Sequence, residues 1–242
     1  MKPIVLTALA ASLALTACAR ADDVDNESNA TSEAKEAALE AQTDDFVINA
    51  EDFGREQLGG KIEGPAGPEV EASLLMADGT SIGDIRSYVA CPENISVCDP
   101  AKLPADTIYT YVHVVTPGVD EPNDDAIGTP KAIKPVAKSV TFRTDMPAGG
   151  FVGHAGYSLE QARAALGPQG TFTVSCNEGK LVWEVASGEF WGTGEPVTFF
   201  WKSRKPPQGP AKAYGFDADG FTANGTGPFP APQADGDATG CT

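Results

Sequence analysis

The sequence predicts an all-β domain, an antiparallel β-sandwich of Ig-like or jelly-roll-like type with one short helix near residues 158–167. Two observations carry this prediction. The 242-residue chain holds 26 glycines and 19 prolines, a share well above the average of about 12%, and such a composition favours many short strands joined by turns. In addition, apolar and polar residues alternate along several stretches, as they do in strands with one buried face.

The clearest alternation lies in residues 170–202, which also hold all three tryptophans. Apolar side chains recur at every second position on both sides of the turn signal Asn177-Glu178-Gly179, a pattern typical of a hairpin. We interpret this stretch as the central antiparallel meander of the sandwich. Trp183 and Trp201 fall at inward positions of their strands, so we expect both in the core.

Further strands are predicted where the same pattern recurs, at residues 69–76, 81–91, 107–116, 139–144 and near 213–216. The segment 107–116 is rich in β-branched and aromatic residues without strict polar alternation, which predicts a central strand. His113 lies in this strand and is interpreted as a packed or partly exposed strand histidine. Beyond residue 225 the chain has almost no large apolar residue except Phe229, which predicts a fraying, Gly/Pro-rich tail.

The helix is the best-marked local element. Ser158 is a favourable N-cap, and Gln161 three residues later completes a capping-box pattern. Gly167 suits the position after the last helical residue, and Pro168 prevents further helix. We therefore expect a helix of about two turns whose apolar side lies against the sheet.

The N-terminus carries a targeting pattern. A positively charged start, Met1-Lys2, precedes an apolar run from Ile4 to Leu15. This run is shorter than the roughly 20 residues that a membrane-spanning helix needs, and it fits the apolar region of a signal peptide. It ends in Leu15-Thr16-Ala17-Cys18.

These four residues resemble the lipobox of bacterial lipoproteins. The resemblance implies that residues 1–17 are removed as a signal peptide and that Cys18 is diacylated through its sulfur. It also implies anchoring of the protein to the membrane by lipid, and Ala19 after the cysteine implies sorting to the outer membrane. The resemblance covers only the first 18 residues, and the mature domain resembles no family that its residues identify.

We expect residues 18–45 to be an acidic, disordered tether. The stretch has nine acidic side chains and two basic ones, Arg20 and Lys35, and it has little apolar surface to bury. The folded domain is expected over residues 46–242. The net charge of −17 argues against a nucleic-acid partner, since phosphate binding needs clustered lysine and arginine.

Four cysteines follow Cys18, an even number in a chain that is expected to be exported. They predict two disulfides, with three possible pairings. Cys91 and Cys98 are close enough in sequence to pair across their own loop, so we favour Cys91–Cys98 and Cys176–Cys241. Zinc is a weaker explanation, because the chain has no Cys-x-x-Cys pair and two histidines.

Four residues are candidates for ligand binding. His154 lies in a Gly-rich segment, residues 148–157, and glycines allow close approach of a ligand to the backbone. Trp191 lies between glycines and is the one tryptophan considered as a candidate for exposure, where it could stack on a sugar. Asp217 and Asp219 share an acidic turn that could bind calcium. The simpler alternatives are a strand-edge turn for His154, a core role for Trp191 and a solvated turn for the aspartates.

The function expected from these features is that of a lipid-anchored, non-enzymatic binding or structural module of the cell envelope, with an envelope protein or a glycan as partner. One alternative is an envelope hydrolase that uses carboxylates and His154. A carbohydrate- or calcium-binding domain is a further alternative. No catalytic residue is assigned, since no motif identifies a nucleophile, and calcium is the one cofactor considered.

Overall fold

The computed structural model describes residues 46–65, 67–120, 130–231 and 240–241. The predicted signal peptide, the lipidation site Cys18 and the predicted tether lie outside the described residues. The described chain is mostly strand and contains one α-helix, α2 (Leu159–Leu166), with two short 3₁₀ turns, η1 (Phe53–Arg55) and η2 (Pro100–Lys102). The all-β prediction with one short helix is therefore confirmed.

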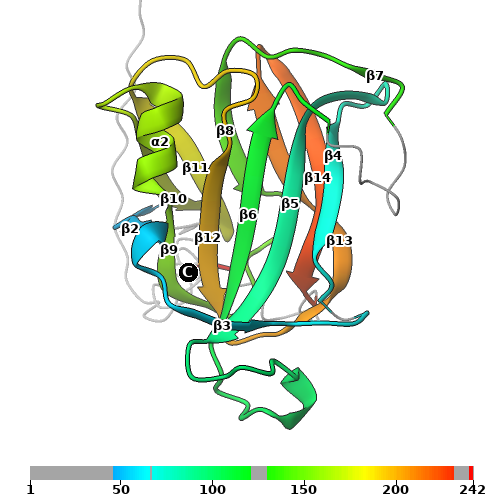
Figure 1. The fold of residues 1–242 in the computed structure, drawn as a ribbon, viewed down its shortest axis with the longest axis vertical. Coiled ribbons are helices and arrows are strands. Elements are labelled where there is room, and N and C mark those ends of the chain that lie inside the picture. The colour runs from blue at the N-terminus through cyan, green and yellow to red at the C-terminus, as the bar shows by residue number, and fades with distance from the viewer. Residues whose placement is uncertain (1–45, 66, 121–129, 232–239, 242) are drawn as a thin grey trace, which may run out of the picture. The chain divides into compact units, whose positions relative to one another are not determined.

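The described strands form one mixed, curled sheet (Figure 1). In chain order they are β1 (Phe46–Ile48), β2 (Glu51–Asp52), β3 (Leu58–Lys61), β4 (Val70–Leu75), β5 (Thr80–Pro92), β6 (Tyr109–Pro117), β7 (Ala132–Ile133), β8 (Ser139–Thr144), β9 (Phe151–Tyr157), β10 (Thr171–Asn177), β11 (Lys180–Ser187), β12 (Val197–Ser203), β13 (Pro207–Ala218) and β14 (Phe221–Pro230). Their order in the sheet is β1-β10-β11-β8-β13-β14-β4-β5-β6-β12-β9-β2, and β3 and β7 pair with β5.

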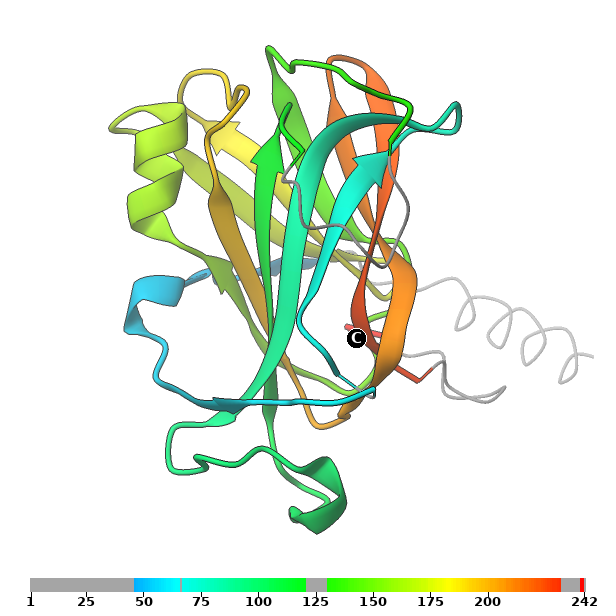
Figure 2. The same ribbon diagram turned by 45° about the vertical axis from the view of Figure 1, so that its right-hand side comes forward.

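The hairpin of β13 and β14 joins the two halves of the sheet, because β13 pairs with β8 and β14 pairs with β4 (Figure 2). Of the fraying tail predicted from residue 225, residues 232–239 lie outside the described residues. The prediction was wrong for residues 225–230, which form the end of strand β14. Its glycines allow close packing instead: a Cβ on Gly225 would come within 2.9 Å of Leu74, and a Cβ on Gly227 within 2.9 Å of both Ser87 and Tyr214. A glycine-rich strand can thus be a central one when neighbouring side chains fill the space above it.

The meander predicted for residues 170–202 is only partly formed. The hairpin of β10 and β11 is confirmed, with Glu178 and Gly179 at positive φ in a two-residue turn. However, β12 pairs with β6 and β9, and β11 pairs with β8. The connection between β11 and β12 carries Trp191 into the core, where its indole N–H donates to the carbonyl of Glu195 at 2.6 Å. Burial of this side chain takes the connection away from β11.

The first described residues pair with both ends of the sheet. Strand β1 lies against β10, with Phe46 opposite Cys176, and β2 lies parallel to β9, with Glu51 opposite Gly156. Strands β1 and β2 are separated by two residues. A single short segment therefore covers the seam between β9 and β10. The strand β9 itself was missed in the Gly-rich stretch 148–157, whose glycines pointed to a loop.

An aromatic cluster fills the inside of the curled sheet. Phe199 of β12 is its centre, with ring centroids at 5.0 Å from Phe142, 5.1 Å from Phe172 and 5.8 Å from Trp183. These rings come from strands in both halves of the sheet. Tilted and edge-to-face aromatic pairs add to the free energy of burial, so the cluster fixes how the halves face each other.

His113 of β6 lies fully buried within this cluster, as the interpretation of a packed histidine expected. Its Nε2 accepts a hydrogen bond from the indole N–H of Trp201 at 3.3 Å. Its Nδ1 lies 2.9 Å from Ser87 Oγ and, in this tautomer, carries the proton and donates. Burial lowers the pKa of His113 from 6.5 to about 3, so the imidazole is neutral in the folded protein.

Strand β12 is also hydrogen-bonded to the N-terminal cap of helix α2. Ser158 Oγ accepts from the backbone N–H of Gln161 at 3.3 Å, which confirms the N-cap. The return half of the predicted capping box is absent, because Gln161 Oε1 accepts from the N–H of Thr198 and the N–H of Ser158 donates to the carbonyl of Thr198, both at 2.8 Å. The cap residues thus fasten α2 to β12.

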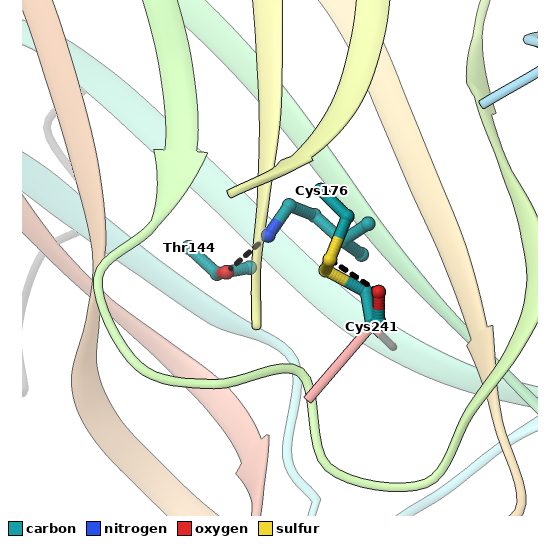
Figure 3. The surroundings of a disulfide bond; sticks show 4 residues. Thr144, Cys176 and Cys241 are labelled. Carbon is teal, nitrogen blue, oxygen red and sulfur yellow. Dashed lines mark hydrogen bonds between the residues drawn. A yellow bond between two sulfur atoms is a disulfide. The ribbon is translucent and has the colours of Figure 1, made fainter. Parts of the chain in front are cut away.

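Both predicted disulfides are present. The Cα atoms are 5.6 Å apart in Cys91–Cys98 and 5.7 Å apart in Cys176–Cys241, within the usual range of about 4.4–6.8 Å. Cys241 is fully buried, and its N–H donates to the carbonyl of Gly179 at 3.1 Å. Figure 3 shows the Cys176–Cys241 disulfide beside Thr144, whose Oγ1 accepts from the N–H of Leu181.

The two disulfides are expected to differ in their contribution to stability. Cys176–Cys241 spans 65 residues, and Cys91–Cys98 spans 7. The chain-entropy model gives a stabilisation of about 4 kcal/mol for the first and about 2 kcal/mol for the second. Replacing Cys176 and Cys241 together by serine should therefore lower the free energy of unfolding more than replacing Cys91 and Cys98 together. Denaturant unfolding of the two double variants measures this, and the reverse ranking would contradict it.

His113 should make folding sensitive to mild acid. The unfolded histidine binds a proton near pH 6.5 whereas the folded one does so only near pH 3, so stability rises with pH between these values. The slope from this group reaches about 1.4 kcal/mol per pH unit. In denaturation curves between pH 5 and 7, His113→Gln should flatten the pH dependence relative to the wild type. An unchanged slope in His113→Gln would contradict the assignment.

Candidate functional site

A groove lies on the outer face of the sheet, over the strands β4, β5, β6 and β12. Alternate residues of a strand point to opposite faces, and the register aligns the outward ones: Glu71 is opposite Arg86, Arg86 is opposite Val114, and Val114 is opposite Thr198. The cavity measures about 550 Å³, within the range of ligand sites. Its lining residues are Phe53, Glu71, Asp84, Arg86, Tyr88, Val114, Thr116, Gln161, Pro196 and Thr198.

The groove has one wall made by η1 and α2. Asp52 holds these two elements together, because its Oδ1 accepts from the N–H of Gly54 at 3.0 Å and from that of Leu159 at 3.2 Å. The ring centroid of Phe53 lies 5.7 Å from that of Phe200 on β12. The wall is thus fixed to β12 both by this aromatic contact and by the cap of α2.

The charged side chains of the groove stand on β4 and β5. Arg86 Nε lies 3.8 Å from a carboxylate oxygen of Glu69, and its Nη1 lies 4.0 Å from one of Glu71. Asp84 is only 5% exposed, and its Oδ1 accepts from the N–H of Ile85 at 2.9 Å. Two carboxylates and one guanidinium therefore face the cavity, which gives it a net negative charge at neutral pH.

The remaining polar groups are uncharged. Burial, with a smaller effect of the Glu69 carboxylate, raises the pKa of Tyr88, so its phenol stays protonated and can donate and accept. Thr116 and Thr198 add hydroxyls, and Gln161 adds an amide whose Oε1 is already occupied by Thr198 N–H. The groove thus combines donors and acceptors with the apolar side chains of Phe53, Val114 and Pro196, an arrangement suited to binding a polar ligand.

His154 lies away from this groove. It is on β9 with a side chain 53% exposed, and its Nδ1 is 2.6 Å from Glu51 Oε1. It lines neither the groove nor a second cavity of about 390 Å³ bounded by Gly60, Lys61, Glu63, Ser96, Val97, Cys98, Asp99 and Pro100. The structure thus gives His154 one carboxylate as partner, outside both cavities.

The hypothesis of an exposed Trp191 was wrong, since its side chain is 0% exposed. Its ring packs edge-on against Phe172 and Phe216 at 5.5 Å. The flanking glycines, read as a sign of an exposed loop, let the chain turn around a side chain that points inward. A buried indole offers no face on which a sugar could stack.

The aspartates proposed for calcium have protein partners. Asp217 pairs with Arg143 and accepts from Thr222 Oγ1 at 2.7 Å. Asp219 accepts from the backbone N–H groups of Ala137 at 3.0 Å and Lys138 at 2.8 Å. Among the described residues, no group of three or more metal-ligating side chains is close enough to hold a metal ion.

The sequence reasoning missed the groove residues because each is ordinary by itself. The usable signal was the run Asp84-Ile85-Arg86-Ser87-Tyr88, in which charged and phenolic side chains alternate with residues that face the core. A strand that keeps three functional groups on the outward face marks that face as a candidate surface. Phe53 and Gln161 reach the same place only through the tertiary fold.

Comparison with known proteins adds no family to this picture: no family model, curated protein or solved structure matches the chain. In the part of the chain that the structure describes, no helix has the length and apolar content needed to span a membrane. The candidate site therefore depends on its own geometry and chemistry.

Proposed function

We propose that this protein is a lipid-anchored, non-enzymatic binding module of the bacterial cell envelope. It is attached through Cys18, and its groove binds and releases a ligand unchanged. The observation that supports binding is the groove of about 550 Å³, in which Asp84, Arg86 and Tyr88 of one strand stand beside the apolar side chains of Val114 and Phe53. The four-residue pattern ending at Cys18 supports the anchor and, with Ala19, the outer membrane.

The groove rather than the His154–Glu51 pair is the basis of this proposal. A binding site needs a cavity that removes ligand surface from water and a few fixed polar groups, and the groove provides both. His154 pairs with the carboxylate of Glu51 and lies outside the cavities described above. The hydrolase alternative would need a nucleophile or a second carboxylate beside this pair.

The proposal extends to the arrangement of the sheet, which we take to pack as a sandwich. Rings from opposite halves of the sheet support this. The ring centroid of His113 of β6 lies 5.7 Å from that of Phe142 of β8 and 4.3 Å from that of Tyr214 of β13. The ring centroid of Phe199 of β12 lies 5.8 Å from that of Trp183 of β11. One half would thus carry the groove on its outer face while its inner face covers the core.

Lipid attachment at Cys18 can be tested by metabolic labelling with a fatty-acid probe. The wild type should incorporate the probe and Cys18→Ala should not, because the acyl chains are attached through this sulfur. The double variant with Cys91 and Cys98 replaced by serine is the matched control and should be labelled like the wild type. Equal labelling of Cys18→Ala would contradict the anchor.

Ligand binding in the groove can be tested by hydroxyl-radical footprinting of the full chain with and without an extract of bacterial envelope. Phe53 and Tyr88 line the groove and should become less reactive when a ligand covers them. Phe190 and Phe221, which are exposed outside the groove, are internal controls and should keep their reactivity. Unchanged reactivity of Phe53 and Tyr88 would contradict binding at this site.

A further inference from the structure

The chemistry of the groove points to an uncharged oligosaccharide as its ligand, an inference that rests on the proposed binding function. The first reason is the mixture of hydrogen-bonding groups. Glu71 and Asp84 accept, Arg86 donates, and the hydroxyls of Thr116 and Thr198 do both. Sugar hydroxyls also donate and accept, so one ligand of this class can pair with all three kinds of group.

The charged side chains of the groove narrow the chemical class of the ligand. Glu71 and Asp84 stand against Arg86, whose guanidinium already lies near the carboxylates of Glu69 and Glu71. An anionic ligand would meet an excess of like charge. A purely apolar ligand would remove water from Arg86 and from the largely buried Asp84 without replacing its hydrogen bonds, which is costly. A neutral ligand rich in hydroxyls avoids both costs.

The apolar part of the groove suits the other side of a sugar ring. Val114 lies between Arg86 and Thr198 across the strands, and Phe53 and Pro196 stand at the wall. The C–H groups of a pyranose face can pack on these side chains while its hydroxyls reach the polar groups. A groove of about 550 Å³ with polar and apolar groups side by side therefore matches a short chain of sugars.

The position of the groove also separates this ligand from an extended peptide. Peptides that add to a sheet bind at an exposed strand edge, through backbone hydrogen bonds. The groove lies on the face of β5, β6 and β12, and each of these strands is paired on both sides. Recognition here must come from side chains, and these are held on paired strands, so little ordering entropy is lost on binding.

The test is calorimetric titration of the full chain, purified in detergent, with a panel of neutral, acidic and basic oligosaccharides. We expect binding of neutral members and none of the acidic ones. Thr198→Val should weaken binding about threefold to tenfold, the effect of one neutral hydrogen bond, because it removes the hydroxyl and leaves the backbone bonds to α2. Arg86→Gln should weaken it by about tenfold or more, since a charged donor is lost.

Thr141→Val is the matched control, since Thr141 lies on β8 and does not line the groove, and it should bind like the wild type. Preference for acidic sugars, or equal binding by Thr198→Val and the wild type, would overturn the assignment. If no oligosaccharide binds but the envelope extract still protects Phe53 and Tyr88, the ligand class is wrong and the binding function stands. If neither result appears, both proposals fail.

Discussion

The close approach of β14 to its neighbours is the constraint on which the rest of the fold depends. Gly225 lies under Leu74 and Ile85, and Gly227 lies against Ser87 and Tyr214, with no space for a Cβ at either position. This contact allows the β13–β14 hairpin to join the half of the sheet that contains β8 with the half that contains β4. The aromatic core forms between these halves, and the strands that carry the groove are supported from below by it.

The core and the groove are the two faces of the same three strands. On β5, β6 and β12, residues such as Ser87, His113 and Phe199 face inward, and their neighbours Arg86, Val114 and Thr198 face outward. Because side chains alternate strictly along a strand, a shift of one residue in register would exchange the two sets. The buried bonds of His113 to Ser87 and Trp201 therefore also fix which residues form the groove.

Local patterns in the sequence predicted local structure well. The Asn177–Gly179 hairpin, the N-cap at Ser158 and the strand that contains His113 all follow from propensities and periodicity within a few residues, and the structure has each of them. The failures share a different cause. Glycines near Phe151, Trp191 and residue 225 were interpreted as signs of ligand approach or a turn, of an exposed side chain and of a fraying tail. In the structure they serve close packing or turns around buried side chains. Composition alone does not distinguish these uses of glycine.

The segment that covers the seam has a mechanical consequence for a chain held at its N-terminus. Tension along the chain would enter the domain at Phe46, which lies opposite Cys176, and Cys176 is covalently linked to Cys241. The load would thus reach the sheet at a cross-linked point rather than at a free edge. Strand β1 would yield first, because it has three residues, while the groove on the distant strands β5 and β6 would keep its shape.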